Sequence, residues 1–466
     1  MNGMREKIVF AGLALLALAS CTTRSLPDLP RVDLKQFEGE VGKAIAREYA
    51  EAGANPRDAN RVLRLGMALH AHDQFQTAAQ CYARVHAIDP QRYDAPYYWG
   101  NALVSLGRYE EAAERLRQAV KLRPTSVPAR LKLAGALREL GNADESAQIS
   151  KGILREEPDN PTARFELGRS LGNNAAIEEF RKALSAFPRY GAAQFALAEA
   201  YRKLNNPAKA QEAIREYERD KTLIPSVIDP EMSALRVLNV SPTGLLSQAG
   251  ELEKDGRLQE ALDLLNRAVA ANPRLVDAYI NMISISGRLG QNQEAEQAYR
   301  RAIQLDPNQA EAHYNFGVLC FEANRSQEAK AAFARTVEIN PRHAEALHNW
   351  GVLLERESKL DQAAGLYLRA INAKASYPLA HFHLGRIYAN QSRYPLAIQE
   401  FERALEPATE ATPTYLYALA AVTARSGARV RAVELMHKAR EQADVRGQSA
   451  LVASIDRDLG ALGAAH

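Results

Sequence analysis

The chain has 466 residues, of which 25% are charged and 46% are hydrophobic, and these ordinary values exclude a largely disordered protein. Its 59 basic residues nearly balance 56 acidic ones, which gives a formal net charge of +3. Because nucleic-acid-binding domains usually carry a strong basic excess, the sequence gives no reason to expect a nucleic-acid partner.

Residues 1–20 have the pattern of a cleaved secretory signal, with a basic start, an apolar run at 8–19 and small residues before Cys21. The apolar run is too short to span a bilayer as a helix. Its end, Leu-Ala-Ser-Cys, resembles the bacterial lipobox. The resemblance implies that Cys21 carries diacylglycerol and an acylated, palmitate-type N-terminus, so that the lipid anchor alone reaches the membrane. Since Thr22 rather than Asp follows, it further implies the outer membrane of a double-membrane bacterium, with the chain facing the periplasm or the cell surface.

Residues 21–34 contain prolines without a periodic apolar pattern, and they predict a flexible spacer. Residues 35–53 then carry apolar side chains at i, i+4 spacing, which predicts an N-terminal capping helix.

Prolines recur every 34 residues in two sets, and glycine and alanine recur with them. The prolines are Pro90, Pro124 and Pro158, then Pro273, Pro307 and Pro341. In one such period, residues 310–343, the residues Phe316-Gly317, Ala329 and Phe333 have the spacing of a helical hairpin. This pattern resembles the tetratricopeptide-repeat family. The resemblance implies an all-α, right-handed solenoid of helical hairpins, in which the small residues let the two helices of each repeat approach closely.

The pattern predicts eleven repeats, starting near residues 59, 93, 127, 161, 191, 242, 276, 310, 344, 378 and 413. In the fourth repeat only 20 residues separate Gly168 from Pro188, which predicts a trimmed turn between its helices. Residues 220–241 match no repeat and are interpreted as a linker. The expected organisation is therefore a block of five repeats with its capping helix at 35–219, and a block of six repeats with a terminal capping helix at 242–466.

In such a solenoid the first helix of each hairpin lines a groove, and position 6 of that helix is asparagine in three consecutive repeats, as Asn281, Asn315 and Asn349. An amide side chain both donates and accepts hydrogen bonds, so a row of amides can hold the backbone of an extended peptide. The row resembles the asparagine ladder in the repeat domain of O-GlcNAc transferase. His383 takes this position in the next repeat. Alternatively, asparagine is only a tolerated polar residue on a solvated face.

Position 5 is often aromatic, with Tyr314, His348 and Phe382 in the second block. Exposed rings suit apolar or proline-rich segments, whereas packing between repeats would bury them. Tyr97 and Tyr98 beside Asn101 form a second candidate peptide-binding patch in the first block.

No nucleophile elbow, phosphate-binding loop or zinc-protease motif occurs, so we expect no catalytic residue, cofactor or small-molecule substrate. Metal binding is not expected either, because His313 and His381 occupy a packing position and the cysteines have no metal-site spacing. Cys81 and Cys320 are expected to be buried thiols.

The sequence favours a membrane-tethered scaffold that binds one or more proteins through extended peptide segments. The alternative is an assembly factor of an outer-membrane secretion, pilus or polysaccharide-export machine. A third possibility is a carbohydrate-binding module, which would use an aromatic ring with an acidic partner. Tyr314 with Glu311 is compatible with such a site but does not favour it.

Overall fold

A computed structural model describes residues 26–220, 222–374 and 376–463. Cys21 and the signal segment lie outside these residues. The described residues form helices and loops without any strand, and the predicted all-α solenoid of helical hairpins is confirmed. Among the helices described, none is both long and apolar enough to span a bilayer.

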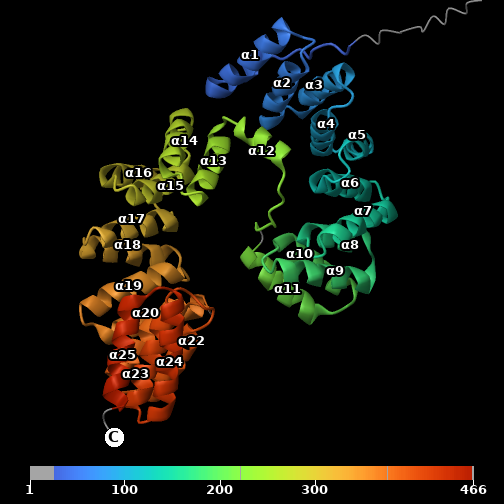
Figure 1. The fold of residues 1–466 in the computed structure, drawn as a ribbon. Coiled ribbons are helices and arrows are strands. Elements are labelled where there is room, and N and C mark those ends of the chain that lie inside the picture. Colours follow the sequence, from blue (N-terminus) through green and yellow to red (C-terminus); the bar gives the residue numbers. More distant parts are fainter. Residues whose placement is uncertain (1–25, 221, 375, 464–466) are drawn as a thin grey trace, which may run out of the picture. The chain divides into compact units, whose positions relative to one another are not determined.

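The chain divides into two compact units, residues 1–240 and 241–466, which we call unit 1 and unit 2. Unit 1 begins with the short η1 (Leu34–Gln36) and α1 (Gly39–Ala54), continues with five hairpins, and ends with a single helix (Figure 1). Its hairpins are α2 (Ala59–Ala71) with α3 (Phe75–Ile88), α4 (Asp94–Ser105) with α5 (Tyr109–Leu122), α6 (Val127–Glu139) with α7 (Ala143–Glu156), α8 (Pro161–Ser170) with α9 (Asn173–Ala186), and α10 (Gly191–Lys203) with α11 (Pro207–Asp220). The single helix is α12 (Pro230–Val237), which forms within the expected linker.

Unit 2 consists of six hairpins and a terminal helix, α25 (Ser449–Gly463). Its hairpins are α13 (Pro242–Lys254) with α14 (Leu258–Ala271), α15 (Val276–Arg288) with α16 (Asn292–Leu305), α17 (Ala310–Glu322) with α18 (Ser326–Ile339), α19 (Ala344–Arg356) with α20 (Leu360–Ala373), α21 (Pro378–Asn390) with α22 (Tyr394–Ala404), and α23 (Thr412–Arg425) with α24 (Arg429–Val445). Each of the first helices begins within one residue of the repeat starts expected from the sequence.

In several hairpins a glycine of the first helix lies in close contact with a large side chain of the second helix. A Cβ atom on Gly317 of α17 would lie 2.6 Å from Cε1 of Phe333 on α18, and Gly351 has the same relation to Tyr367 in the next hairpin at 2.7 Å. Phe333 and Tyr367 are fully buried. The glycine therefore makes room for the ring that fills the space between the two helices.

The turn inside the fourth hairpin is short, because α8 ends at Ser170 and α9 begins at Asn173. Other hairpins place one residue with positive φ in this turn, such as Gly290 at 75° or Ser358 at 61°. The deletion noticed in the sequence thus falls in the turn and leaves both helices in place.

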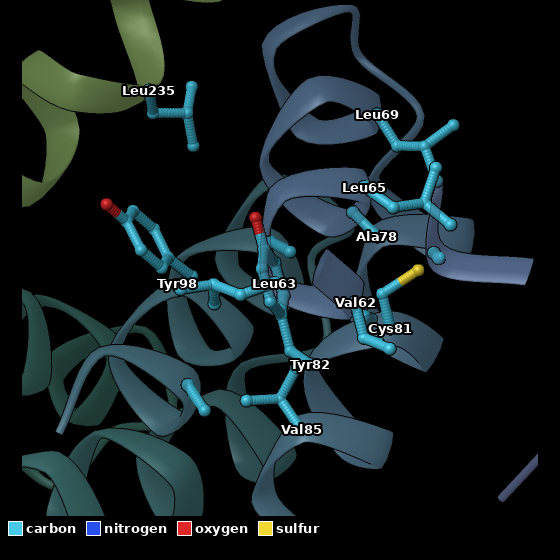
Figure 2. Close-up of a cluster of buried hydrophobic side chains, with 14 of the residues drawn as sticks. Val62, Leu63, Leu65, Leu69, Ala78, Cys81, Tyr82, Val85, Tyr98 and Leu235 are labelled. Atoms are coloured by element: carbon cyan, nitrogen blue, oxygen red, sulfur yellow. The ribbon is translucent and has the colours of Figure 1, made fainter. Parts of the chain in front are cut away.

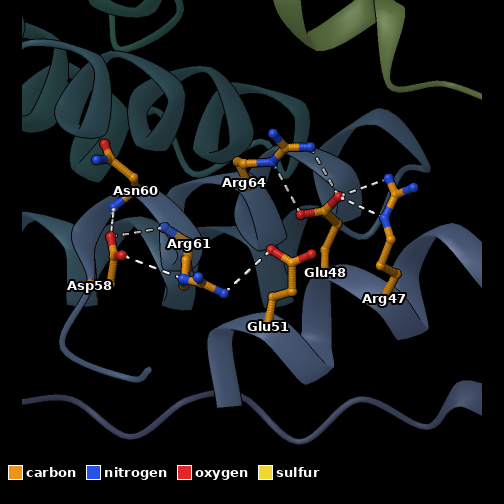
Figure 3. A network of polar contacts seen from close by, with 7 residues as sticks. All are labelled: Arg47, Glu48, Glu51, Asp58, Asn60, Arg61 and Arg64. Carbon is orange, nitrogen blue, oxygen red and sulfur yellow. Dashed lines mark hydrogen bonds and ion pairs between the residues drawn. The ribbon is translucent and has the colours of Figure 1, made fainter. Parts of the chain in front are cut away.

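The helix α1 is attached to the first hairpin by a polar network (Figure 3). Glu48 of α1 is only 3% exposed and accepts hydrogen bonds from Arg47 and, at 3.2 Å, from Arg64 of α2. Burial alone would raise the pKa of Glu48, but the two guanidinium groups outweigh burial and lower it. The carboxylate therefore stays ionised and links the capping helix to the repeats.

Part of the expected spacer also belongs to the folded unit. Leu29 and Val32 pack against the buried cluster of the first hairpin, which includes Tyr82, and Arg84 of α3 donates hydrogen bonds to the carbonyl oxygens of Pro27 and Pro56. The chain is thus held against the first hairpin well before α1 begins.

The first core cluster contains Cys81, which is fully buried as expected, together with Tyr82 and Tyr98 (Figure 2). Leu235 of α12 belongs to the same cluster, and the figure shows it above the ring of Tyr98. Cys320 has the same environment in unit 2, where it lies in the core beside Phe333. Burial raises the pKa of both thiols, to about 12 and about 11, so they stay protonated and unreactive.

Candidate functional site

The three asparagines of unit 2 lie on successive first helices, Asn281 on α15, Asn315 on α17 and Asn349 on α19, and each is partly exposed. The helices α15 and α17 pack side by side. The side-chain nitrogen of Asn315 donates to the backbone carbonyl of Ile280, at 3.3 Å, so this amide links one repeat to the one before it. This bond uses the Nδ2 donor, so the Oδ1 atom of the same amide can accept a hydrogen bond from a ligand.

Asn349 has two aromatic neighbours. Its Oδ1 atom lies 3.0 Å from Nδ1 of His348, and its side chain lies near Tyr314 of the preceding repeat, where it lowers the pKa of that hydroxyl against the effect of burial. Because Oδ1 is only an acceptor, Nδ1 of His348 must carry the ring proton. The amides of Asn315 and Asn349 are thus oriented by their neighbours before any ligand arrives, which reduces the entropy lost on binding.

The position-5 rings lie between repeats. Tyr314 contacts His343 with ring centroids 4.6 Å apart, and Phe382 contacts Tyr415 at 4.7 Å. His348 is 4% exposed, whereas Tyr314 and Phe382 are half-buried. Packing between repeats therefore accounts for most of their ring surface, and only parts of Tyr314 and Phe382 remain available to a ligand.

A carboxylate that we did not single out in the sequence organises the end of the asparagine row. Glu355, at the end of α19, accepts hydrogen bonds from Nδ1 of His383 and from the hydroxyl of Tyr367, both at 3.0 Å. Arg386 forms an ion pair with it at 3.4 Å. Burial acts to raise the pKa of Glu355, but the bond from His383 and the other neighbours prevail and lower it.

Both Glu355 and Arg386 lie at groove-lining positions of the repeat, 12 and 9, so the repeat pattern contained a signal for them. Only the structure shows that they meet His383, because that contact joins two different repeats. The row of amides therefore ends at a charged cluster formed by Glu355, His383 and Arg386.

The buried His348 makes the stability of unit 2 depend on pH. Burial lowers the pKa of His348 to about 4. Its ordinary value is about 6.5, so the unfolded chain binds a proton between pH 6.5 and pH 4 that the folded chain does not bind. The free energy of unfolding should therefore fall as the pH falls through this window, by up to about 3 kcal/mol.

The His348→Phe variant removes this group and places there the residue type that Phe382 provides in the next repeat. Urea unfolding at pH 7 and pH 4.5 should show a smaller loss of stability for this variant than for the unchanged chain. His437 is exposed on α24, and the His437→Gln variant should keep the full loss. Equal losses in all three proteins would contradict the assignment.

The aromatic patch of unit 1 is not open to solvent. Tyr97 and Tyr98 are buried, and Asn101 donates to the backbone carbonyl of Tyr97 at 2.9 Å. The hydroxyl of Tyr97 donates to Asp229, at 2.5 Å, and that of Tyr98 donates to the carbonyl oxygen of Glu231, at 2.8 Å. The patch therefore contacts a segment of the same chain, within the stretch interpreted from the sequence as a linker.

Within the part of the chain that the structure describes, no group of three or more His, Cys, Asp or Glu side chains could hold a metal ion. The histidines noted in the sequence have other contacts. His381 pairs with Glu400, with Nδ1 and Oε2 2.6 Å apart, and His313 bonds the hydroxyl of Tyr299 at 2.9 Å.

Family comparisons agree with this architecture. A family model described as tetratricopeptide repeat matches residues 103–164, 173–222 and 288–349, and a second model with that description matches 321–378 and 348–415. Together they span more than half of the chain. No curated protein sequence matches it.

Several solved structures are similar. PilF from Pseudomonas aeruginosa is 15% identical, with a TM-score of 0.42, over 47% of this chain and 97% of PilF. PilW, described as a type IV pilus biogenesis factor, is 19% identical, with a TM-score of 0.39, over 46% of this chain and 97% of PilW. Yeast Tom70 is 13% identical, with a TM-score of 0.39, over 87% of this chain and 96% of Tom70. These likenesses say nothing about the partners of this chain.

Proposed function

Because the chain belongs to the tetratricopeptide-repeat family, we propose that it is a membrane-tethered scaffold whose unit 2 binds extended segments of partner proteins, and that it is not an enzyme. The lipid on Cys21 would hold it at the outer membrane. The ligands are protein segments, and neither a small molecule nor a nucleic acid is required.

The observation that carries this proposal is the row formed by Asn281, Asn315 and Asn349 across three adjacent hairpins. An extended strand rises about 3.3 Å per residue, so a segment of several residues is needed to pass three helices. The oxygen of Asn315 can accept from a backbone N–H of such a segment. Recognition of the backbone rather than of side chains suits a scaffold with more than one partner.

The charged cluster at the end of the row restricts the charge that a bound segment can carry there. Arg386 is 46% exposed, whereas its partner Glu355 is 17% exposed. A ligand carboxylate that approaches Arg386 would compete with Glu355, which already holds three donors. We therefore expect the segment to be neutral where it passes α19 and α21.

Replacing all three row residues together, Asn281→Ala, Asn315→Ala and Asn349→Ala, should reduce capture of partner proteins by the membrane-anchored chain at least about tenfold. Each lost amide removes hydrogen bonds worth about 0.5–1.5 kcal/mol, so three losses are sufficient. Crosslinking and mass spectrometry of captured proteins provide the measurement, and circular dichroism checks that the helices remain.

A matched control replaces three exposed asparagines on second helices of the same unit, Asn266, Asn292 and Asn372, with alanine. This control should capture the same partners as the unchanged chain. If the row variant also captures them unchanged, the row is not the binding site. A Cys21→Ser variant in the same assay should leave the membrane fraction and keep its affinity for the partners.

A further inference from the structure

Residues 223–238 lie against the face that the first helices of unit 1 form, which we call the first-helix face. After α11 the chain turns back along the unit toward α2 (Figure 1). The backbone N–H of Gly191, at the start of α10, donates to the carbonyl oxygen of Leu223 at 3.1 Å. Val227 then packs with Leu131 of α6 and Ala163 of α8. The segment thus runs past α10 first and past α8 and α6 next, which is the reverse of the order of these helices in the chain.

The next part of the segment makes polar contacts with α4 and with Arg123, the residue that follows α5. Asp229 caps α12, since its Oδ1 accepts from the backbone N–H of Met232 at 3.0 Å, while its Oδ2 accepts from Tyr97. The carboxylate of Glu231 forms an ion pair with Arg123 at 2.6 Å. An acidic residue at the start of a helix also interacts favourably with the helix dipole. Asp229 and Glu231 therefore hold the helix start in one place.

The apolar side of α12 completes the contact. Met232 packs against two core clusters of unit 1, and Leu235 is 6% exposed in the first of them. Leu238 packs against that cluster too. The spacing of three residues puts these side chains on one face of the helix, and Val237, on the other side, is 65% exposed.

A helix of eight residues is not stable alone in water, so α12 depends on this contact. The fit is incomplete: a hollow of about 420 Å³ remains between the segment and the first-helix face, lined by Leu63, Met67, Arg92, Tyr98 and Glu231 among others. Ile228 of the segment is also 86% exposed. The segment resembles a bound peptide more than an integral part of the core.

We propose that residues 223–238 are an internal ligand of unit 1, and that the first-helix face binds in their place a partner segment of the same chemistry. That chemistry is an extended aliphatic stretch, then Asp-Pro-Glu at the start of a short helix, then apolar residues three apart along one face. The complementary groups are the hydroxyls of Tyr97 and Tyr98, the guanidinium of Arg123, and the apolar surface of α2. This inference is independent of the function proposed for unit 2.

The first test displaces the internal ligand in the full chain. Met232→Asp together with Leu235→Asp places charges in the apolar contact, and Val237→Asp places one on the exposed side of the same helix as a control. The probe is a fluorescent synthetic peptide with the sequence of residues 223–240, and binding is measured by fluorescence anisotropy. The double variant should bind it at least about tenfold more tightly than the unchanged chain and the control, because a competing internal ligand lowers apparent affinity.

A second test does not disturb the core. Arg123 is 49% exposed, so Arg123→Glu should fold, and it repels the Glu231 of both the internal segment and the probe. A probe carrying Glu231→Arg should then bind the Arg123→Glu chain about fivefold more tightly than the original probe does. Equal affinities would overturn the proposal. So would a double variant that keeps its helical circular dichroism and still does not bind the probe, which would make the segment only a structural strut.

Discussion

Phe333→Ala should lower the free energy of unfolding of unit 2 by about 3–5 kcal/mol, which is the usual loss for a buried aromatic ring replaced by alanine. The ring is fully buried and lies over Gly317 of the facing helix. Chemical denaturation followed by circular dichroism gives the measurement. In a repeat protein neighbouring hairpins support one another, so the hairpins on either side of α17 and α18 should become less stable too.

The same contact predicts a coupling between the two positions. Gly317→Ala places a methyl group 2.6 Å from the ring, which should cost about 1–3 kcal/mol. In a chain that already carries Phe333→Leu, the added methyl group should cost much less, because the smaller side chain leaves room for it. The double-mutant cycle measures this difference.

Gly365 of α20 provides the control, since a Cβ atom there meets nothing within 4 Å. Gly365→Ala should raise the free energy of unfolding by up to about 1 kcal/mol, because alanine favours the helix. Strictly additive effects at Gly317 and Phe333 would show that the hairpin does not depend on this close approach.

Arg84→Met should cost about 3 kcal/mol and should release the chain that precedes α1. The guanidinium is 7% exposed and donates to the carbonyl oxygen of Pro56 from Nε at 2.7 Å and from Nη2 at 2.5 Å, and to that of Pro27 from Nη1. Hydrogen bonds from a charged donor are worth about 1.5–3 kcal/mol each. Methionine keeps the length of the side chain but has no donor, so the carbonyl groups of Pro27 and Pro56 both lose their partner.

Hydrogen exchange followed by mass spectrometry measures the release directly. In the Arg84→Met chain the amides of residues 31–54 should exchange faster than they do in the unchanged chain, whereas the amides of unit 2 should exchange at the same rate in both. Arg57 is exposed near the same loop, and Arg57→Met should leave exchange unchanged. Unchanged exchange in the Arg84→Met chain would show that other contacts, such as those of Leu29 and Val32, are sufficient.

The fold could be predicted because the sequence of each repeat contains the signals for its own two helices. The period of 34 residues fixes where helices end, and the glycine and ring positions, such as Gly317 and Phe333, determine how the two helices pack. Which repeat positions line the groove follows from their place within the first helix of each hairpin alone. Asn281, Asn315 and Asn349 were therefore found without a structure, although whether they bind a peptide stays a prediction.

Contacts outside the repeat could not be found in the same way. The stretch 220–241 contains Asp229-Pro230, a normal helix start, and Met232, Leu235 and Leu238 with helical spacing. These signals indicate a short amphipathic helix, but no local pattern says which surface receives it. The contact of Asp229 with Tyr97 joins residues 132 positions apart, so only the folded chain reveals that Tyr97 and Tyr98 are already occupied.

The central claim is that partner segments bind along the asparagine row of unit 2. A photo-crosslinking amino acid at position 315, on α17, tests it most directly when compared with the same amino acid at position 292, on α16. In the membrane-anchored chain, position 315 should crosslink to extended segments of partner proteins and position 292 should not. Crosslinks from position 292 alone would contradict the claim and would favour docking through the second helices, as expected of an assembly factor.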